Sequence, residues 1–378
     1  MLLRTATLLA ALVATTYCLA QTTTGTITHD GGERNYRLYV PSSYQAGVPM
    51  PFVYNLHGLG SNALEQELYS GMNAVAESEG FIVCYPNGVN AAWNVGFAFN
   101  SPTDDVGFLN ALVDTLSATY SIDQSRVYSC GMSNGGYMSY KLACEVSDRY
   151  AAVASVTGAM VPSAPADCSP SRAVPTLQIH GTNDLTVPYE GSSINVPIET
   201  LVEFWATLNS CESDPDTTDI ADTDPDDGTT ATRYRYDDCT DGNEVHFYKI
   251  TDGGHTWPGG AVVIGPTNYD IDASTVIWEF FEQFSTSGTT PVQSIAGSPA
   301  QPLLLTPNPA TDQVRVAQYT TDAESLTLYD ATGSMWLTQT RQQADWGTLD
   351  VSQLPRGVYF VQVRGRGGMV QVGKVVVE

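Results

Sequence analysis

One serine in this sequence has neighbours that can turn its hydroxyl group into a nucleophile. Residues 131–135, Gly-Met-Ser-Asn-Gly, follow an apolar stretch at 126–130 and precede a stretch with helical spacing. Glycines on both sides of a serine permit the tight, strained turn from a strand into a helix that exposes the hydroxyl group. We therefore predict that Ser133 is the nucleophile of an acyl-transfer reaction. A glycine-rich turn that only tightens packing is the alternative.

A serine nucleophile needs a general base, and the sequence has five histidines. His255 lies in a glycine-rich loop, residues 252–260, after the last predicted strand of this part of the chain. The other four lie ahead of, at the end of, or within predicted strands: His29, His57, His180 and His246. Because glycines on both sides let the loop aim an imidazole back at Ser133, we predict that His255 is the base and not a surface histidine.

The base in turn needs a carboxylate that orients it, and hydrolases with this turn carry their residues in the order serine, acid, histidine. Asp184 comes just after a predicted strand at 176–179, where such folds place the acid. Asp252 is a rival, but its loop would have to curl tightly to reach His255 three residues later. We predict that Asp184 orients His255. A carboxylate that caps a turn is the alternative.

The negative charge that develops on the substrate's carbonyl oxygen needs two hydrogen-bond donors. The backbone N–H of Asn134, directly after the serine, is the first predicted donor. The second lies in residues 57–60, His-Gly-Leu-Gly, after the second predicted strand. It is the N–H of Leu59 or of Gly58, which the sequence does not distinguish. We expect His57 to order this loop rather than to contact the substrate.

Aromatic residues near these segments could form a pocket for the acyl group. The candidates are Trp93, Phe97, Phe99 and Trp257, with a core or rim position as the alternative for each. The acidic stretch 214–227 could hold calcium, but Asp227 stands where a calcium loop needs glycine, so a solvated loop is favoured. No histidine and cysteine cluster has the spacing of a zinc site. The predicted chemistry needs neither a metal nor a cofactor.

These residues require elements that bring strand ends together. Over residues 25–284, short apolar strands alternate with amphipathic helices. The helix expected around 106–120 has apolar residues three and four apart, with Asp104 and Asp105 as capping candidates. This alternation predicts an α/β fold, in which a mostly parallel sheet is covered by helices on both faces.

The sequence divides into four parts. Residues 1–20 have a basic start, a short apolar run and a small-residue end, which predict a secretory signal peptide. Their apolar run is shorter than the roughly 20 residues of a membrane span. Residues 21–284 form the predicted catalytic domain, and 285–302 form a linker rich in serine, threonine, glycine and proline. Residues 303–378 show the alternation and turns of a small β-sandwich.

Removal of the signal peptide leaves six cysteines, an even number that predicts disulfides in an exported protein. Cys211 and Cys239 bracket a polar loop that a bridge would close. Cys144 and Cys168 are the next pair. The other two, Cys84 and Cys130, lie in apolar strand-like runs and are expected to be buried and free.

The charge of the chain excludes some partners. Its formal net charge is −25, with 41 acidic and 16 basic residues. Nucleic acids and anionic lipid surfaces would repel such a chain, whereas a neutral ester or polymer would not. No segment after the signal peptide could cross a membrane.

Six motifs occur in order along residues 25–284: YRLYVP at 36–41, LHG at 56–58, DDVGF at 104–108, GMSNGG at 131–136, HGTND at 180–184 and GGHTWPG at 253–259. Together they resemble the poly(3-hydroxybutyrate) depolymerase-like esterases, a group that includes feruloyl esterases and acetylxylan esterases. The resemblance implies an α/β-hydrolase with a triad of Ser133, Asp184 and His255. Members of the group hydrolyse several different esters, so the resemblance does not fix the substrate.

Motifs in the last part of the chain carry a second resemblance: LTPNPA at 305–310, LYDATG at 328–333, LPRGVY at 354–359 and GKVVV at 373–377. They are similar to the C-terminal sorting domain of the type IX secretion system. This implies passage through an outer membrane, removal of the domain, and either release or attachment at the cell surface. A carbohydrate-binding β-sandwich is the alternative, although the sequence has no row of aromatic residues for it.

These observations predict a secreted serine carboxylic-ester hydrolase that acts on polymer-linked esters. Export by this route favours feruloyl or acetyl esters of plant cell-wall polysaccharide. An extracellular poly(3-hydroxybutyrate) depolymerase is the first alternative. The second, from another class, is a non-catalytic surface protein that binds glycans.

Overall fold

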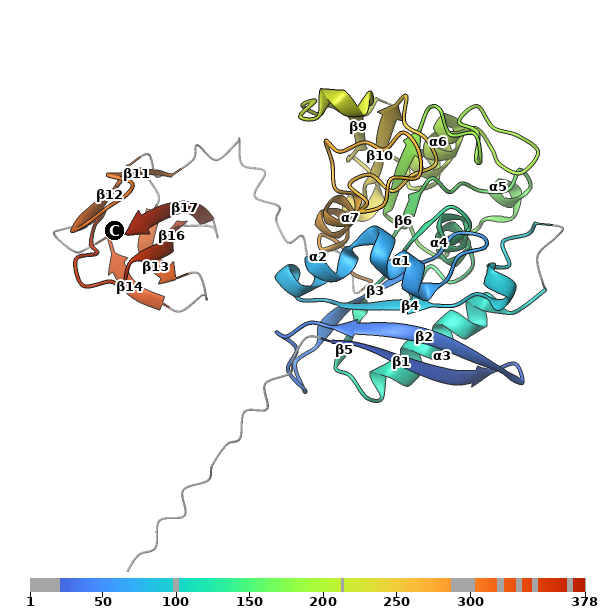
Figure 1. The fold of residues 1–378 in the computed structure, drawn as a ribbon, viewed down its shortest axis with the longest axis horizontal. Helices are drawn as coiled ribbons and strands as arrows, with labels where there is room; N and C mark the ends of the chain where they lie inside the picture. The colour runs from blue at the N-terminus through green and yellow to red at the C-terminus, as the bar shows by residue number, and fades with distance from the viewer. Residues whose placement is uncertain are drawn as a thin grey trace, which may run out of the picture. The chain divides into compact units, whose positions relative to one another are not determined.

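A computed structural model describes residues 21–97, 102–211, 214–286, 303–317, 323–330, 335–341, 346–365 and 370–377. The chain forms two compact units, Met1–Val292 and Gln293–Glu378 (Figure 1). The predicted signal peptide, and the predicted linker beyond residue 286, lie outside the described residues.

The first unit is built on one ten-stranded sheet with the strand order β1-β2-β4-β3-β5-β6-β7-β10-β9-β8 (Figure 1). From β4 to β10 in that order the neighbouring strands are parallel, and the strands at the two edges pair antiparallel. The strands are β1 (Gln21–His29), β2 (Gly32–Val40), β3 (Met50–Leu56), β4 (Ile82–Pro86), β5 (Ile122–Met132), β6 (Ala152–Val156), β7 (Thr176–Gly181), β8 (Asp216–Asp219), β9 (Thr230–Tyr236) and β10 (Val245–Thr251). The predicted mostly parallel sheet is confirmed, and the carboxyl ends of its central strands share one edge.

Helices cover both faces of this sheet. They are α1 (Ala63–Ser70), α2 (Met72–Glu79), α3 (Asp105–Ser117), α4 (Asn134–Glu145), α5 (Ala164–Asp167), α6 (Ile198–Leu208) and α7 (Ala273–Phe281), with short 3-10 turns at Val89–Ala91, Pro225–Asp227 and Thr240–Gly242. Side chains of α3, α4 and α6 form one apolar core. Those of α1, α2 and α7 form the other.

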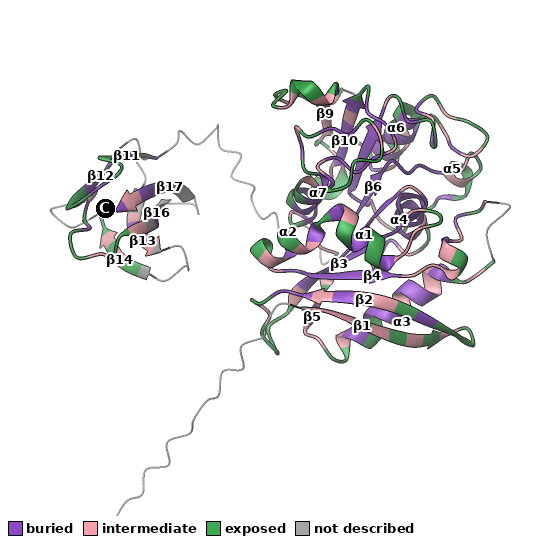
Figure 2. Ribbon diagram, viewed as in Figure 1, coloured by how far each residue is buried: buried purple, intermediate pink, exposed green. Residues whose placement is uncertain are grey.

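The two cores follow from strand geometry. Successive side chains of a strand point to opposite faces of the sheet, and the neighbours Val53 and Tyr54 of β3 accordingly belong to different cores. Both are buried, as are all the side chains of β4, β6 and β7. Figure 2 shows the buried centre of the sheet and the more exposed hairpin of β1 and β2. Strands covered on both faces read as continuous apolar runs, which is why the sequence predicted them.

Helix α3 shows how sequence sets an element. The carboxylate of Asp104 accepts a hydrogen bond from the N–H of Gly107 at 2.8 Å, which satisfies a donor that the first turn leaves free. Leu109, Val113 and Leu116 are buried on one side of the helix. The predicted cap and apolar face are therefore confirmed.

The structure also contains an element that the sequence analysis did not predict. β1 pairs with β2 along its whole length and extends the sheet by one strand. Its sequence is dominated by threonine, and its described side chains are exposed or half-buried. An edge strand of this kind lacks the apolar run by which the other strands are recognised.

Both predicted disulfides are confirmed. Cys144 is bonded to Cys168, and Cys211 is bonded to Cys239. Cys84 and Cys130 are free and buried, as expected. The first bridge ties the end of α4 to the end of α5, and the second closes the segment between α6 and β10.

The second unit contains two antiparallel sheets around an apolar core. Their orders are β11-β12-β15 and β14-β13-β16-β17. The strands are β11 (Leu304–Thr306), β12 (Gln313–Ala317), β13 (Ala323–Asp330), β14 (Met335–Thr340), β15 (Thr348–Asp350), β16 (Gly357–Gly365) and β17 (Val370–Val377). Valine and leucine side chains from both sheets meet in this core, so the expected small all-β domain is present. In the part of the chain that the structure describes, no helix is long and apolar enough to span a bilayer.

Candidate active site

Ser133 occupies a strained turn between β5 and α4. Its backbone angles are φ 52° and ψ −120°, a conformation that side-chain-bearing residues rarely adopt. The flanking glycines are required by close approach: a Cβ on Gly131 would lie 2.6 Å from the backbone of Gly135. A Cβ on Gly135 would lie 2.1 Å from the carbonyl oxygen of Leu56 in β3. The turn therefore holds the serine at the carboxyl edge of the sheet, at the amino end of α4.

His255 and Asp184 come from loops that follow neighbouring parallel strands, β10 and β7. Nδ1 of His255 is 2.7 Å from Oδ2 of Asp184, which corresponds to a hydrogen bond from the imidazole to the carboxylate. The other carboxylate oxygen accepts hydrogen bonds from the backbone N–H groups of Thr186 and Val187, each at 2.8 Å. The carboxylate is buried and held on both oxygens, which fixes the direction in which it meets the imidazole.

A second imidazole lies against the same carboxylate. Nε2 of His180 is 3.3 Å from Oδ2 of Asp184 and 2.9 Å from the carbonyl oxygen of Val187. Nδ1 of His180 accepts a hydrogen bond from the side-chain amide of Gln178, which leaves the proton on Nε2. Burial raises the pKa of Asp184, but the hydrogen bonds from His180 and His255 outweigh it and hold that pKa below its usual value. The carboxylate therefore stays charged.

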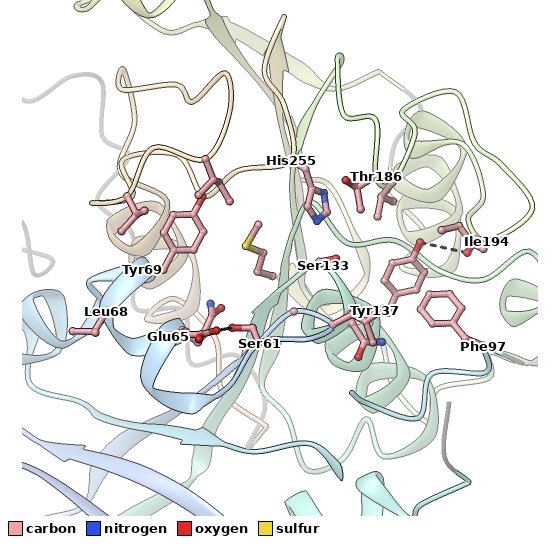
Figure 3. Close-up of a pocket in the computed structure, with 18 residues that line it drawn as sticks. Ser61, Glu65, Leu68, Tyr69, Phe97, Ser133, Tyr137, Thr186, Ile194 and His255 are labelled. Atoms are coloured by element: carbon pink, nitrogen blue, oxygen red, sulfur yellow. Dashed lines mark hydrogen bonds between the residues drawn. The ribbon is translucent and has the colours of Figure 1, made fainter. Parts of the chain in front are cut away.

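Ser133 and His255 line the same cavity, whose volume is about 620 Å³. In Figure 3 the imidazole of His255 points toward Ser133. Phe97, Tyr137, Thr186 and Ile194 lie on one side of this pair, and Leu68 and Tyr69 on the other. An ester bound at Ser133 would have apolar walls on both sides of the scissile bond.

The predicted oxyanion segments border this cavity. Gly58, Leu59 and Asn134 all line it. His57 does not; it is buried, and its Nδ1 lies 2.8 Å from the carbonyl oxygen of Gly58. Its Nε2 accepts a hydrogen bond from the N–H of Gly88 at 3.0 Å. Burial lowers the pKa of His57, so the ring stays neutral and orders the loop, as expected.

Of the four aromatic residues predicted to line the pocket, two do not line it, and Phe99 lies outside the described residues. Trp93 and Trp257 are fully buried, so the prediction is wrong for both. Trp93 packs on His57 and donates its indole N–H to the carbonyl oxygen of that residue at 2.9 Å. Trp257, two residues after His255, packs in the apolar core that α1, α2 and α7 cover. Phe97 does line the cavity, where its ring meets that of Tyr137 edge-on at 5.1 Å.

Several lining residues were missed by the sequence analysis. They come from α1, from the first turn of α4 and from the loops after β7 and β10: Leu68, Tyr69, Tyr137, Ile194, Val262 and Ile264. Of these, only Tyr137 could have been predicted from the sequence, because it lies one helical turn after Ser133 and faces the same side of α4. The others reach the cavity only through the packing of their loops.

The acidic stretch accepts hydrogen bonds from backbone groups of its own loop and of the loop between β10 and α7. Asp227 accepts from the N–H groups of Thr229 and Tyr269 at 2.7 and 2.8 Å. Among the described residues, no group of three or more histidine, cysteine or acidic side chains could hold a metal ion.

Sequence comparisons agree with this geometry. Residues 28–259 match the model of the Esterase family. A protein of Nocardia uniformis subsp. tsuyamanensis named as an esterase, NocK, is 32% identical over 292 residues, which cover 69% of this chain and 83% of that protein. Feruloyl esterase C of Emericella nidulans is 28% identical over 254 residues, covering 66% of this chain and 83% of that protein.

A bifunctional acetylxylan esterase/xylanase of Neocallimastix patriciarum is 27% identical over 284 residues. These cover 74% of this chain but only 37% of that protein. Among solved structures, the acetyl xylan esterase from Aspergillus awamori superimposes with a TM-score of 0.50 at 18% identity. It covers 69% of this chain and 99% of that one, and it shows the fold.

The C-terminal unit has its own match. Residues 305–378 correspond to the C-terminal sorting domain of a secretion system, which indicates export. The larger unit has the α/β-hydrolase sheet, a serine at a strand–helix turn and a family match over most of its length. The chain therefore belongs to the esterase family, is a carboxylic-ester hydrolase of the α/β-hydrolase fold, and carries a secretion-system sorting domain at its C-terminus.

Proposed function

We propose that this protein is a secreted serine esterase that works through Ser133, His255 and Asp184 and forms an acyl-enzyme. The observation that carries the proposal is the 2.7 Å hydrogen bond between His255 and a buried, doubly held Asp184. The imidazole so oriented lines the same cavity as a serine in a strained turn. These are the parts that nucleophilic acyl transfer requires.

In the proposed reaction, Oγ of Ser133 attacks the ester carbonyl while Nε2 of His255 takes its proton. Asp184 stabilises the imidazolium that forms. The backbone N–H of Asn134, with that of Leu59 or Gly58, donates to the oxyanion. The alcohol then leaves with the proton from His255. Water attacks the acyl-enzyme by the same route, which releases the acid and restores Ser133.

The proposed substrates are feruloyl or acetyl esters of plant cell-wall polysaccharide. Relatives named as feruloyl esterase and acetylxylan esterase support this class. The cavity of about 620 Å³ far exceeds an acetyl group, and the aromatic rings of Phe97 and Tyr137 form part of its wall. A planar aromatic acyl group would bury much more apolar surface there, which favours feruloyl over acetyl esters.

A second candidate is an extracellular poly(3-hydroxybutyrate) depolymerase, and one observation favours it. Four residues that line the cavity are also strongly exposed: Leu59 at 52%, Leu68 at 63%, Val262 at 50% and Ile264 at 59%. Leu185, next to Asp184, is 93% exposed. Exposed apolar residues gathered around a site suit contact with an apolar surface. A solid polyester offers such a surface.

The sorting domain extends the proposal to location. We place the enzyme outside the cell after removal of residues 1–20 as a signal peptide and of the C-terminal domain by the secretion machinery. Release and attachment to the cell surface are both compatible with the match over residues 305–378. Mass spectrometry of the culture medium and of the washed cell surface would distinguish them.

The deciding experiment uses the chain from Gln21 onward. Initial rates are measured on methyl ferulate, acetylated xylan and a poly(3-hydroxybutyrate) film, with Ser133→Ala as the control. We expect the highest kcat/KM on the ferulate and at least a thousandfold loss in Ser133→Ala. Preference for the film would select the depolymerase. Tight binding to xylan without turnover of any ester would contradict the enzyme and support a glycan-binding protein.

A further inference from the structure

Trp93 connects the two segments that carry the proposed oxyanion donors. It lies in the loop between β4 and α3, and it is fully buried. One partner is the loop after β3, which contains Gly58 and Leu59. The other is the start of α4, at Asn134. Trp93 forms hydrogen bonds to both sides.

On the first side, the indole N–H of Trp93 donates to the carbonyl oxygen of His57 at 2.9 Å. The imidazole of His57, which packs against the indole, holds the carbonyl oxygen of Gly58 at 2.8 Å. The N–H of a trans peptide points opposite to its carbonyl. Fixing these two carbonyls therefore fixes the directions of the N–H groups of Gly58 and Leu59.

On the second side, the backbone N–H of Trp93 donates to Oδ1 of Asn134 at 2.6 Å. The side-chain amide of Asn134 donates back to the carbonyl oxygen of Trp93 at 3.3 Å. Asn134 is itself buried. Its backbone N–H is the other proposed donor, so the residue that carries this donor is clamped to the same tryptophan.

The loop of Trp93 is in turn anchored to the body of the unit. The N–H of the next residue, Asn94, donates to the buried carboxylate of Asp105 at 2.7 Å. The guanidinium group of Arg34 pairs with that carboxylate at 2.7 Å and lies over the ring of Phe108. A tryptophan held in this way can act as a rigid spacer.

We propose that Trp93 is a positioning residue that sets the distance and direction between the two oxyanion donors. The inference rests on the proposed acyl-transfer function. Donors fixed before the reaction stabilise the oxyanion without reorganising, so a donor that can drift loses part of this effect. Trp93 would act on the transition state and not on the substrate, since it does not line the cavity.

The test is Trp93→Phe, which removes the indole N–H and keeps an aromatic ring against His57. Loss of a whole oxyanion donor costs about 10²–10³ in kcat, so we expect a loosened donor to cost roughly 10–100-fold. KM should stay within about twofold. The Ki of phenylboronic acid, whose tetrahedral adduct with the serine mimics the oxyanion, should rise by the same factor as kcat/KM falls.

Trp205→Phe is the matched control. Trp205 is equally buried in α6, and its indole N–H has no hydrogen-bond partner. Trp205→Phe makes the same chemical change as Trp93→Phe but breaks no hydrogen bond, so its kcat and boronate Ki should stay at the wild-type values. A Trp93→Phe enzyme with kcat within twofold of that control would overturn the proposal. So would a fall in kcat without any rise in the boronate Ki.

A second variant covers the case in which Trp93→Phe does not fold. Asn134→Ala breaks the link from the other side and keeps the backbone N–H of residue 134, so the same fall in kcat at constant KM is expected. If both single variants fold, the double variant should lose little more than one of them, because each breaks the same bridge from His57 through Trp93 to Asn134 at a different point. Independent, additive losses would contradict a shared role.

Ser133→Ala separates this inference from the proposed function. Turnover retained in Ser133→Ala would defeat the function itself. An inactive Ser133→Ala beside a fully active Trp93→Phe would defeat only the role of Trp93.

Discussion

Replacing Asp184 by asparagine changes one hydrogen-bonding atom and almost nothing in shape. In the native protein Oδ1 accepts from two backbone N–H groups, those of Thr186 and Val187. The asparagine must keep its carbonyl oxygen at that position, because an NH2 group there would face two backbone N–H groups, which, unlike the imidazole of His255, cannot move their protons. Its NH2 group would then replace Oδ2, the atom that lies 2.7 Å from Nδ1 of His255.

This arrangement disables the base. His255 can accept from the new NH2 group only when Nδ1 is unprotonated, which moves the ring proton to Nε2. Nε2 then cannot take the proton of Ser133. A change of this kind lowers kcat by about 10⁴, which corresponds to about 5.5 kcal/mol in activation free energy. KM should change little, because Asp184 does not line the cavity.

The assay measures kcat and KM of Asp184→Asn on methyl ferulate at pH 7, with a thermal melt to show that the variant folds. Asp252→Asn is the matched control, since Asp252 is the rival acid and accepts a hydrogen bond from Asn183 at the surface. We expect wild-type kcat for this control. The reasoning fails if Asp184→Asn keeps kcat within tenfold of wild type, or if Asp252→Asn loses as much.

Three further predictions concern the fold that carries the site. Gly135→Ala should abolish activity and lower Tm, because its Cβ would meet a backbone carbonyl at 2.1 Å, whereas Gly32→Ala, with nothing nearer than 3.7 Å, should leave both unchanged. Burial raises the pKa of Glu244, but hydrogen bonds to an imidazole and a guanidinium outweigh it and lower the pKa to about 2. A carboxylate whose pKa is lower in the folded state stabilises the folded protein at pH values above its unfolded pKa of about 4.3. This stabilisation is lost as the pH falls through the folded pKa. Glu244→Gln should therefore reduce the free energy of unfolding at pH 7 by on the order of 2 kcal/mol, and urea titrations should show this deficit vanish between about pH 4.5 and 2. The double change of Cys211 and Cys239 to serine opens a loop with a separation of 28 residues. It should cost about 3–4 kcal/mol in the free energy of unfolding, with kcat unchanged because neither residue lines the cavity; a fall in kcat at constant folded fraction would refute this.

Local sequence carried most of the information about the parallel sheet and the turn that holds Ser133. Strands buried on both faces need continuous apolar runs, and a turn that brings Gly135 against β3 needs glycine. Both requirements leave a recognisable pattern in a short run of consecutive residues, so they can be inferred without tertiary structure. The edge strand β1 could not be read in this way, because a strand exposed at an edge needs no apolar run.

The residues that line the pocket could not be predicted from local sequence, as the two tryptophans show. Trp93, Trp257 and Phe97 are all aromatic and all lie near site loops in the sequence, yet only Phe97 reaches the cavity. Whether a large apolar side chain faces a cavity or the core depends on which neighbours pack around it. Those neighbours come from distant segments. The indole N–H of Trp93, for example, donates to the carbonyl oxygen of His57, 36 residues earlier.

The sequence by itself determined the order and the chemistry of the candidate residues, because a strand–turn–helix serine, a carboxylate after a strand and a histidine in a glycine loop are local features. Tertiary structure alone decided that His255 meets Asp184 across 71 residues and that a second imidazole, His180, lies against the same carboxylate. It also decided that Trp93 joins the segments of the two proposed oxyanion donors. The physical reason is that hydrogen bonds and close packing act over a few ångströms in space, and parallel strands bring together loops that lie far apart along the chain.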